Sequence, residues 1–215
     1  MIDLHTHSLL SDGDLLPSEL VRRAEAMRYK AIAITDHSDA SNLDFVVKRI
    51  VNVCNELRDG GAIPVIPGVE LTHIPPRQIE HMVKRARELG ARLVLVHGET
   101  IVEPVAPGTN SAAIKAGVDI LAHPGLLSSE DAELAAERSV YLELSARKGH
   151  SLSNGHVASI AKRFNVNMVL NTDTHSPSDF ISDEVAKKIV VGAGLTEEDF
   201  RRITKNAEEI LQRTL

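Results

Sequence analysis

The sequence predicts an α/β fold, a distorted (β/α)7 TIM-like barrel that occupies residues 1–215 as a single domain. Seven short apolar runs alternate with amphipathic stretches at a spacing of roughly 30 residues, the size of a βαβ unit. The runs are continuous in Val, Ile and Leu, as in parallel strands that are buried on both faces. Polar residues follow six of the seven runs. An open doubly wound sheet, the alternative, would gather such residues at one switch point.

The first half of the chain supplies four of the predicted strands. They cover residues 2–7, 31–35, 63–67 and 92–96. The helices between them begin at Pro17, which suits a first helical turn, at Ser41 as a plausible N-cap, and after Pro75-Pro76. Pro64 and Pro67 are unusual for a central strand.

The second half of the chain repeats the alternation with three further strands. They cover residues 118–122, 140–144 and 166–170, and the intervening helices lie near 111–116, 128–138 and 157–164. Two helices close the chain. The last of them opens at Thr196, and Asp199 three positions later completes a capping-box pattern.

Composition narrows the class of protein. The chain has 215 residues, 43% hydrophobic and 25% charged, enough for one sizeable core, and its lone Cys54 predicts a core residue without an intramolecular disulfide. No apolar run approaches the roughly 20 residues that span a bilayer, and no secretory pattern opens the chain. We therefore expect a cytoplasmic protein without a membrane partner. A net charge of -6 and 3% aromatic residues also predict that nucleic acid is not a partner.

Histidines and carboxylates mark the ends of the predicted strands. His5 and His7 alternate with Thr6, so in a strand both imidazoles face the same way, which is half of a tetrahedral metal site. The same residue types recur after later strands, and the full set of candidate metal ligands is His5, His7, Asp12, His37, Glu70, His97, His123, Asp173 and His175. Nine such groups at one barrel mouth would repel or stay unsatisfied without cations. The mixed N/O set suits two to three divalent ions such as Zn, Mn or Fe.

Six short motifs occur in order along most of the chain. They are His5-Thr6-His7 with Ser11-Asp12-Gly13, Thr35-Asp36-His37, Gly68-Val69-Glu70, Val96-His97-Gly98, Ala122-His123-Pro124 and Thr172-Asp173-Thr174-His175. Together they resemble the PHP (polymerase and histidinol phosphatase) family. The resemblance implies one ion held by His5, His7, Glu70 and Asp173, a second by Asp12, His37 and His175, and a third by Glu70 with His97 and His123.

The loop after the sixth strand carries basic residues instead of metal ligands. Arg147 and Lys148 adjoin Gly149, and an Arg fork beside a Lys point charge suits a phosphate dianion. Arg147 is the predicted main phosphate ligand, with Lys148, Asn154 and Arg77 as further substrate-binding candidates. Asp173, His175 and Arg147 are the predicted catalytic residues. His73, His150 and Glu99 are weaker candidates to contact substrate or to support a ligand.

These patterns predict a metal-dependent phosphatase. The expected substrate is a small phosphomonoester, such as histidinol phosphate or a related metabolite, attacked by a metal-activated hydroxide. One alternative is a phosphodiesterase or exonuclease that acts on nucleotides, because the resemblance also covers polymerase-associated domains. The other is a non-catalytic scaffold barrel, from which we would expect lost ligands. The oligomeric state is not predicted.

Overall fold

Seven parallel strands follow one another in chain order around a nearly closed barrel, in the computed structural model of residues 1–215. The strands are β1 Ile2–Asp3, β2 Ala31–Ile34, β4 Val65–Leu71, β5 Leu93–His97, β6 Ile120–Ala122, β7 Tyr141–Ser145 and β8 Met168–Asn171. A two-residue strand, β3 His37–Ser38, pairs beside β4. A strand forms at each predicted run, although β1 ends at Asp3 and not at residue 7, and β4 continues through Pro67 to Leu71. The predicted distorted barrel is confirmed in preference to the open sheet.

The barrel closes where the segments that follow β1 and β8 meet. Thr6 and Thr174 form an isolated parallel bridge. The backbone N–H of His7 donates to the carbonyl of Thr174 at 2.8 Å, and that of Asp173 donates to the carbonyl of His5 at 3.0 Å. The closure therefore sets the two polar segments at opposite ends of the chain side by side.

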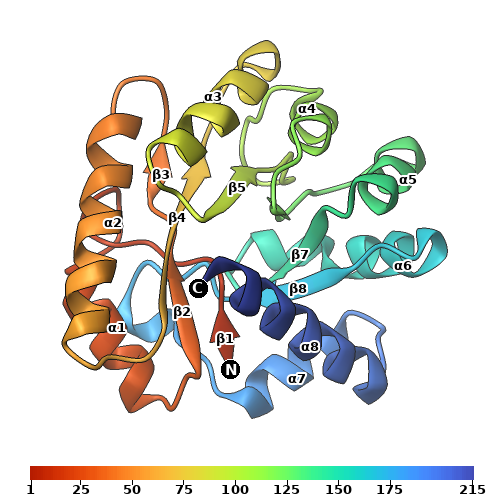
Figure 1. Cartoon of the computed structure of the whole chain (residues 1–215). Helices are drawn as coiled ribbons and strands as arrows, with labels where there is room; N and C mark the ends of the chain where they lie inside the picture. The colour runs from red at the N-terminus through yellow and green to blue at the C-terminus, as the bar shows by residue number, and fades with distance from the viewer.

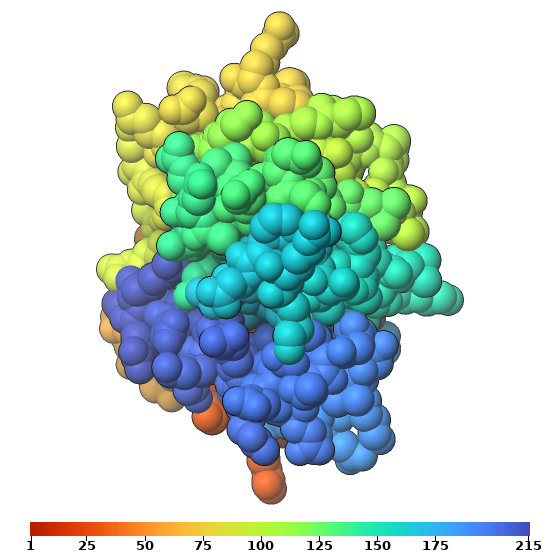
Figure 2. Space-filling view, turned by 90° about the vertical axis from the view of Figure 1, so that its right-hand side faces the viewer, coloured from red at the N-terminus to blue at the C-terminus, as the bar shows by residue number.

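Eight α-helices surround the strands or cover one end of the barrel (Figure 1). They are α1 Pro17–Ala26, α2 Leu43–Asp59, α3 Pro76–Glu88, α4 Thr109–Lys115, α5 Ser129–Arg138, α6 Asn154–Phe164, α7 Asp183–Gly192 and α8 Glu197–Thr214, with short 3-10 turns η1 His150–Ser153 and η2 Pro177–Asp179. Figure 2 shows one side of this wall, where the colours pass from α3 at the top to the closing helices at the bottom.

Alternate residues of each strand enter different cores. Along β5, Leu93 and Leu95 belong to the cluster inside the barrel, whereas Val94 and Val96 pack in the layer beneath the helices. Helix α8 lies over β1 and β8 (Figure 1), and it contributes Ala207 and Ile210 to the inner cluster. This helix fills the end of the barrel where the strands begin, so the polar strand ends face the opposite mouth.

Several helix boundaries follow local rules. Ser128 caps α5 by accepting the backbone N–H of Asp131 at 3.0 Å, and Thr196 and Asp199 form the predicted capping box on α8. The predicted cap at Ser41 is wrong: α2 starts after Asn42, and the Ser41 hydroxyl donates to Asp39 at 2.6 Å.

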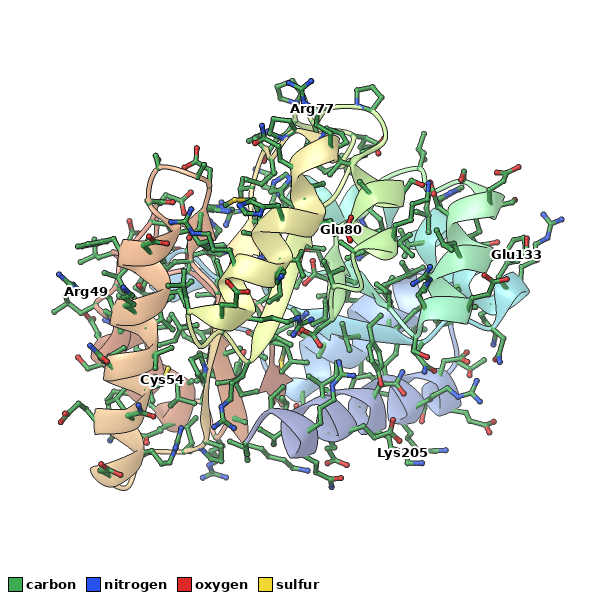
Figure 3. All side chains as sticks on the ribbon, turned by 45° about the horizontal axis from the view of Figure 1, so that its top comes forward. Arg49, Cys54, Arg77, Glu80, Glu133 and Lys205 are labelled. Carbon is green, nitrogen blue, oxygen red and sulfur yellow. The ribbon has the colours of Figure 1, made fainter.

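Helix α2 also carries the only cysteine, Cys54, which is labelled in Figure 3. The thiol is fully buried among apolar neighbours, and burial raises its pKa to about 12. Cys54 is a core residue, as predicted. None of the helices is both long and apolar enough to cross a membrane.

Candidate metal centre

A cavity of about 240 Å³ opens at the carboxyl ends of the strands and has no hydrophobic lining residue. Its walls are Asp12, His37, Thr72, His73, His97, Glu103, His123, Arg147, His150, Asp173 and His175. His5, His7 and Glu70 are completely buried and make their contacts with these lining residues. The structure thus brings all nine predicted metal-ligand residues to one place. A separate, mostly apolar cavity of about 180 Å³ lies between β1, α7 and α8 and contains none of them.

The innermost group combines two histidines that follow β1 with the carboxylates of Glu70 in β4 and Asp173 just beyond β8. His5 Nε2 lies 3.2 Å from Glu70 Oε2 and 3.6 Å from Asp173 Oδ1. His7 Nε2 lies 3.5 Å and 3.2 Å from the same two oxygens. Two ligands of a tetrahedral zinc ion with bonds of about 2.0 Å are separated by about 3.3 Å. The four measured separations therefore match the edges of one coordination shell.

The same donor atoms have no hydrogen-bond partner in the protein. They are His5 Nε2, both ring nitrogens of His7, both oxygens of Glu70 and Asp173 Oδ1. A buried polar atom without a partner costs about 1–3 kcal/mol. One cation could bind His5 Nε2, His7 Nε2, Glu70 Oε2 and Asp173 Oδ1 together, so the residues present fit a metal ion.

Partners on the far side of the ring orient His5. Its Nδ1 lies 2.8 Å from Glu143 Oε1, and Glu143 is itself held by the side-chain amide of Asn171 at 2.8 Å. Burial acts to lower the pKa of His5, but Glu143 and Glu70 outweigh it and raise that pKa. Burial acts to raise the pKa of Glu70, but His5 and the other histidines hold it well below its usual range. Glu70 is therefore ionised at neutral pH.

A second group lies nearer the cavity opening. Asp12 Oδ1 is 3.3 Å from His175 Nε2, 3.7 Å from His37 Nε2 and 4.0 Å from His7 Nδ1. Partial burial acts to raise the pKa of Asp12, but a hydrogen bond to His175 and the charge of His37 lower it to about 2. Burial and the nearby His37 and His5 hold the pKa of His7 well below its usual range, so its ring is neutral and free to bind a cation.

The third predicted group is only partly assembled as the resemblance implied. His123 Nε2 lies 3.4 Å from Glu70 Oε1. His97 Nε2 instead pairs with Glu103 Oε2 at 3.1 Å. Glu103 was not predicted from the sequence because it lies six positions after His97 in an irregular loop without periodicity. The predicted mouth histidine His150 faces the other Glu103 oxygen at 3.5 Å.

Arg147 reaches the cavity as predicted. Its Nη1 donates to the carbonyl of Asp173 at 3.1 Å and lies 2.8 Å from His175 Nδ1, and its side chain remains 32% exposed. Lys148 is exposed beside it, and with Arg147 it lines a shallow depression that also includes Ser176. The basic loop therefore borders the metal centre with free surface around it.

Three other candidates do not face the cavity. Asn154 is 6% exposed, and its amide bonds both the N–H and the carbonyl of Ser145 at 3.0 and 2.8 Å, so it shapes the loop after β7. Arg77 is exposed at the start of α3, at the outer edge of the molecule (Figure 3). Glu99 accepts the backbone N–H groups of residues 108 and 110 at the start of α4 and does not support His97.

The fold and site define a parallel α/β barrel with a histidine- and carboxylate-rich centre at its mouth. The PHP domain model matches residues 3–97. The uncharacterized protein MJ1295 of Methanocaldococcus jannaschii is 49% identical over 214 residues, 98% of each chain. This chain belongs to the PHP domain family, whose members are generally metal-dependent hydrolases.

Other similarities are more distant. The 5'-3' exoribonuclease Rnm of Salmonella typhimurium is 38% identical over 81 residues, only 26% of its own length and 38% of this chain. Ribonuclease P protein component 3 of Methanosarcina barkeri is 26% identical, covering 94% of this chain and 85% of that protein.

Two solved structures share the fold. An archaeal ribonuclease P with mature tRNA contains a chain with TM-score 0.76 and 19% identity, which covers 99% of this chain and 90% of that one. Histidinol phosphate phosphatase of Lactococcus lactis, complexed with zinc, L-histidinol and phosphate, has TM-score 0.61 and 17% identity, with coverage of 91% and 94%.

Proposed function

We propose that this protein is a metal-dependent phosphomonoesterase that acts on a small phosphate ester. The observation that carries the proposal is the set of buried, unpartnered donor atoms on His5, His7, Glu70 and Asp173, beneath a fully polar cavity with Arg147 at its edge. The shared fold with a histidinol phosphate phosphatase supports the same class of reaction.

The donor groups suit two to three divalent ions. His5, His7, Glu70 and Asp173 would hold the innermost ion, and Asp12, His37 and His175 the second. When bound, such ions polarise phosphate oxygens and lower the pKa of a water nucleophile.

Among the side chains of the protein, Arg147 would bind the phosphate group of the substrate. Its Nη1 is held by the Asp173 carbonyl, which fixes the guanidinium beside the cavity, and its remaining N–H groups can meet a phosphate as a fork. Lys148 adds positive charge outside the cavity. Because the cavity has no hydrophobic wall, it suits the phosphate group, and the organic substituent would lie outside.

The test compares a phosphomonoester with a phosphodiester. Chelator-stripped protein is reloaded with Zn or Mn and assayed with p-nitrophenyl phosphate and bis-p-nitrophenyl phosphate. We expect monoester cleavage that disappears in Glu70→Ala and Asp173→Ala together with the bound metal, whereas His81→Gln on the exposed face of α3 keeps both. Full activity in either alanine variant would reject the proposal.

A second candidate is cleavage of nucleic acid. One relative is named as an exoribonuclease and another as a ribonuclease P component, so the expectation that nucleic acid is not a partner finds no support among the relatives. An end-labelled RNA oligonucleotide provides the discriminating substrate. Metal-dependent cleavage of RNA without monoester turnover would select this function, and RNA binding without cleavage would select a scaffold role.

A further inference from the structure

Glu103 enters the polar cavity from the loop between β5 and α4 and contacts two histidines. Its Oε2 lies 3.1 Å from His97 Nε2, and its Oε1 lies 3.5 Å from His150 Nε2. We infer that Glu103 and His150 are, with His97, the ligands of the outermost ion. This inference rests on the proposed function, because it assigns ligands to one of the ions that the reaction requires.

The contact distances are those of a coordination shell. Ligands at about 2.0 Å from a tetrahedral zinc ion are about 3.3 Å apart, between the two measured separations. The imidazoles are almost fully buried at 3% and 5% exposure, whereas the Glu103 side chain is 38% exposed. The histidines thus form a fixed wall, and the carboxylate closes the group from the solvent side.

The outer nitrogens of both rings are already engaged by neighbours. Nδ1 of His97 lies 3.2 Å from the Gly98 carbonyl, which can only accept, so this nitrogen donates its proton there and Nε2 is the atom left to bind an ion shared with Glu103. Nδ1 of His150 lies 2.8 Å from the Thr100 hydroxyl. Such outer hydrogen bonds orient metal-ligating histidines.

His123 does not complete this outer group. The rings of His123 and His150 stack with centroids 4.0 Å apart and planes at 14°. Because imidazole lone pairs lie in the ring plane, two stacked rings direct them side by side and not toward one ion. His123 Nε2 instead faces Glu70 Oε1 at 3.4 Å, a contact that His150 lacks, and this places His123 with the inner donors. Both rings also lie near Asp173 Oδ2, His123 Nε2 at 3.8 Å and His150 Nε2 at 3.7 Å.

The outer group therefore has two imidazoles and one carboxylate. This composition occurs in hydrolytic zinc sites that keep a position open for water or substrate. It differs from the set that the family resemblance implied, in which Glu70 and His123 accompany His97. A simple ion pair between a protonated histidine and Glu103 is the competing explanation, and it predicts that loss of Glu103 leaves the metal content unchanged.

The experiment measures metal binding without substrate. Wild type, Glu103→Gln and His150→Asn are stripped, dialysed to equilibrium against zinc and analysed for metal content, with Glu80→Gln and His81→Asn on the exposed face of α3 as matched controls. We expect each site variant to lose one ion, or to bind it roughly 10-fold or more weakly, and the controls to match wild type. Equal zinc content and affinity in all five proteins would overturn the inference.

A crystal of the zinc-loaded protein provides the second measurement. Anomalous scattering at the zinc edge should show a peak between His97, Glu103 and His150. A peak among Glu70, His97 and His123 would overturn the inference. The two proposals also fail separately: a wild-type protein that holds this ion but cleaves no phosphomonoester contradicts only the proposed function.

Discussion

Glu143 Oε1 lies 2.8 Å from Nδ1 of His5, on the opposite side of the imidazole from Glu70. The His5 ring thus lies between the Glu143 carboxylate and the Glu70 carboxylate of the innermost group. Glu143 has no open path to the cavity, since it is completely buried in β7. Its effect on the metal centre must therefore pass through His5 and through the backbone N–H of His123, which donates to its other oxygen at 3.0 Å.

Glu143→Gln should weaken the innermost ion. A glutamine cannot accept hydrogen bonds at both ends, so either the His5 ring or the His123 N–H loses its acceptor. We expect zinc affinity to fall roughly 10- to 100-fold in a competition titration with a chromophoric chelator. Glu133→Gln, on the exposed part of α5, is the control, and equal affinities in the two variants would contradict this role for Glu143.

Metal binding should stabilise the whole barrel. The unpartnered donors gain partners only in the folded state, because the unfolded chain does not hold them together. At free zinc of 100 times the dissociation constant, the free energy of unfolding should rise by about 2.7 kcal/mol per site. Urea unfolding of stripped and reloaded protein measures this, and coincident curves would show that the donors bind no ion.

Arg147→Met should impair phosphomonoester turnover selectively. Hydrogen bonds to a charged group contribute about 1.5–3 kcal/mol, which corresponds to a loss of roughly 10- to 100-fold in kcat/KM. Lys148→Met is the matched control because Lys148 is the exposed neighbour on the same loop, and we expect a change of less than about 3-fold. The assignment of phosphate binding fails if the two variants behave alike.

The capping box of α8 predicts a pH-dependent contribution to stability. The Thr196 backbone N–H and Lys162 lower the pKa of Asp199 from 3.8 to about 2, although partial burial acts against them. Since the pKa is lower in the folded state, the stabilisation is complete above about pH 4 and is lost as the pH falls toward 2.

Asp199→Asn tests this contribution. The variant should be about 1 kcal/mol less stable than wild type at pH 7, because the carboxylate lies near the surface and its ion pair is screened. The difference should shrink between pH 4 and pH 2 in urea unfolding curves. A difference that stays constant over this range would mean that the charge of Asp199 contributes nothing.

The spacing of the strands and the residues at their ends were sufficient to predict the barrel and to predict that the candidate metal ligands lie together at its mouth. His37 and Asp173 each follow an apolar run that the sequence predicts to be a buried strand, and His5 lies in the first such segment. Glu103 and Asn154 show the limit of this reasoning. Glu103 lies in a loop and Asn154 is the first residue of α6, and at such positions the direction of a side chain depends on backbone turns and on neighbouring segments. The Asn154 amide is used by the Ser145 backbone, a pairing that no spacing rule reveals.

The bridge between Thr6 and Thr174 has a consequence for the growing polypeptide. Asp3 and Thr172, which are hydrogen-bonded across the closure, lie 169 positions apart. During synthesis, His5 and His7 cannot contact Asp173 and His175 until nearly the whole barrel has left the ribosome. A chain interrupted before β8 cannot assemble the inner donor set and keeps unpaired edges on β1 and β7. Metal binding at the innermost group would therefore distinguish full-length chains from truncated ones.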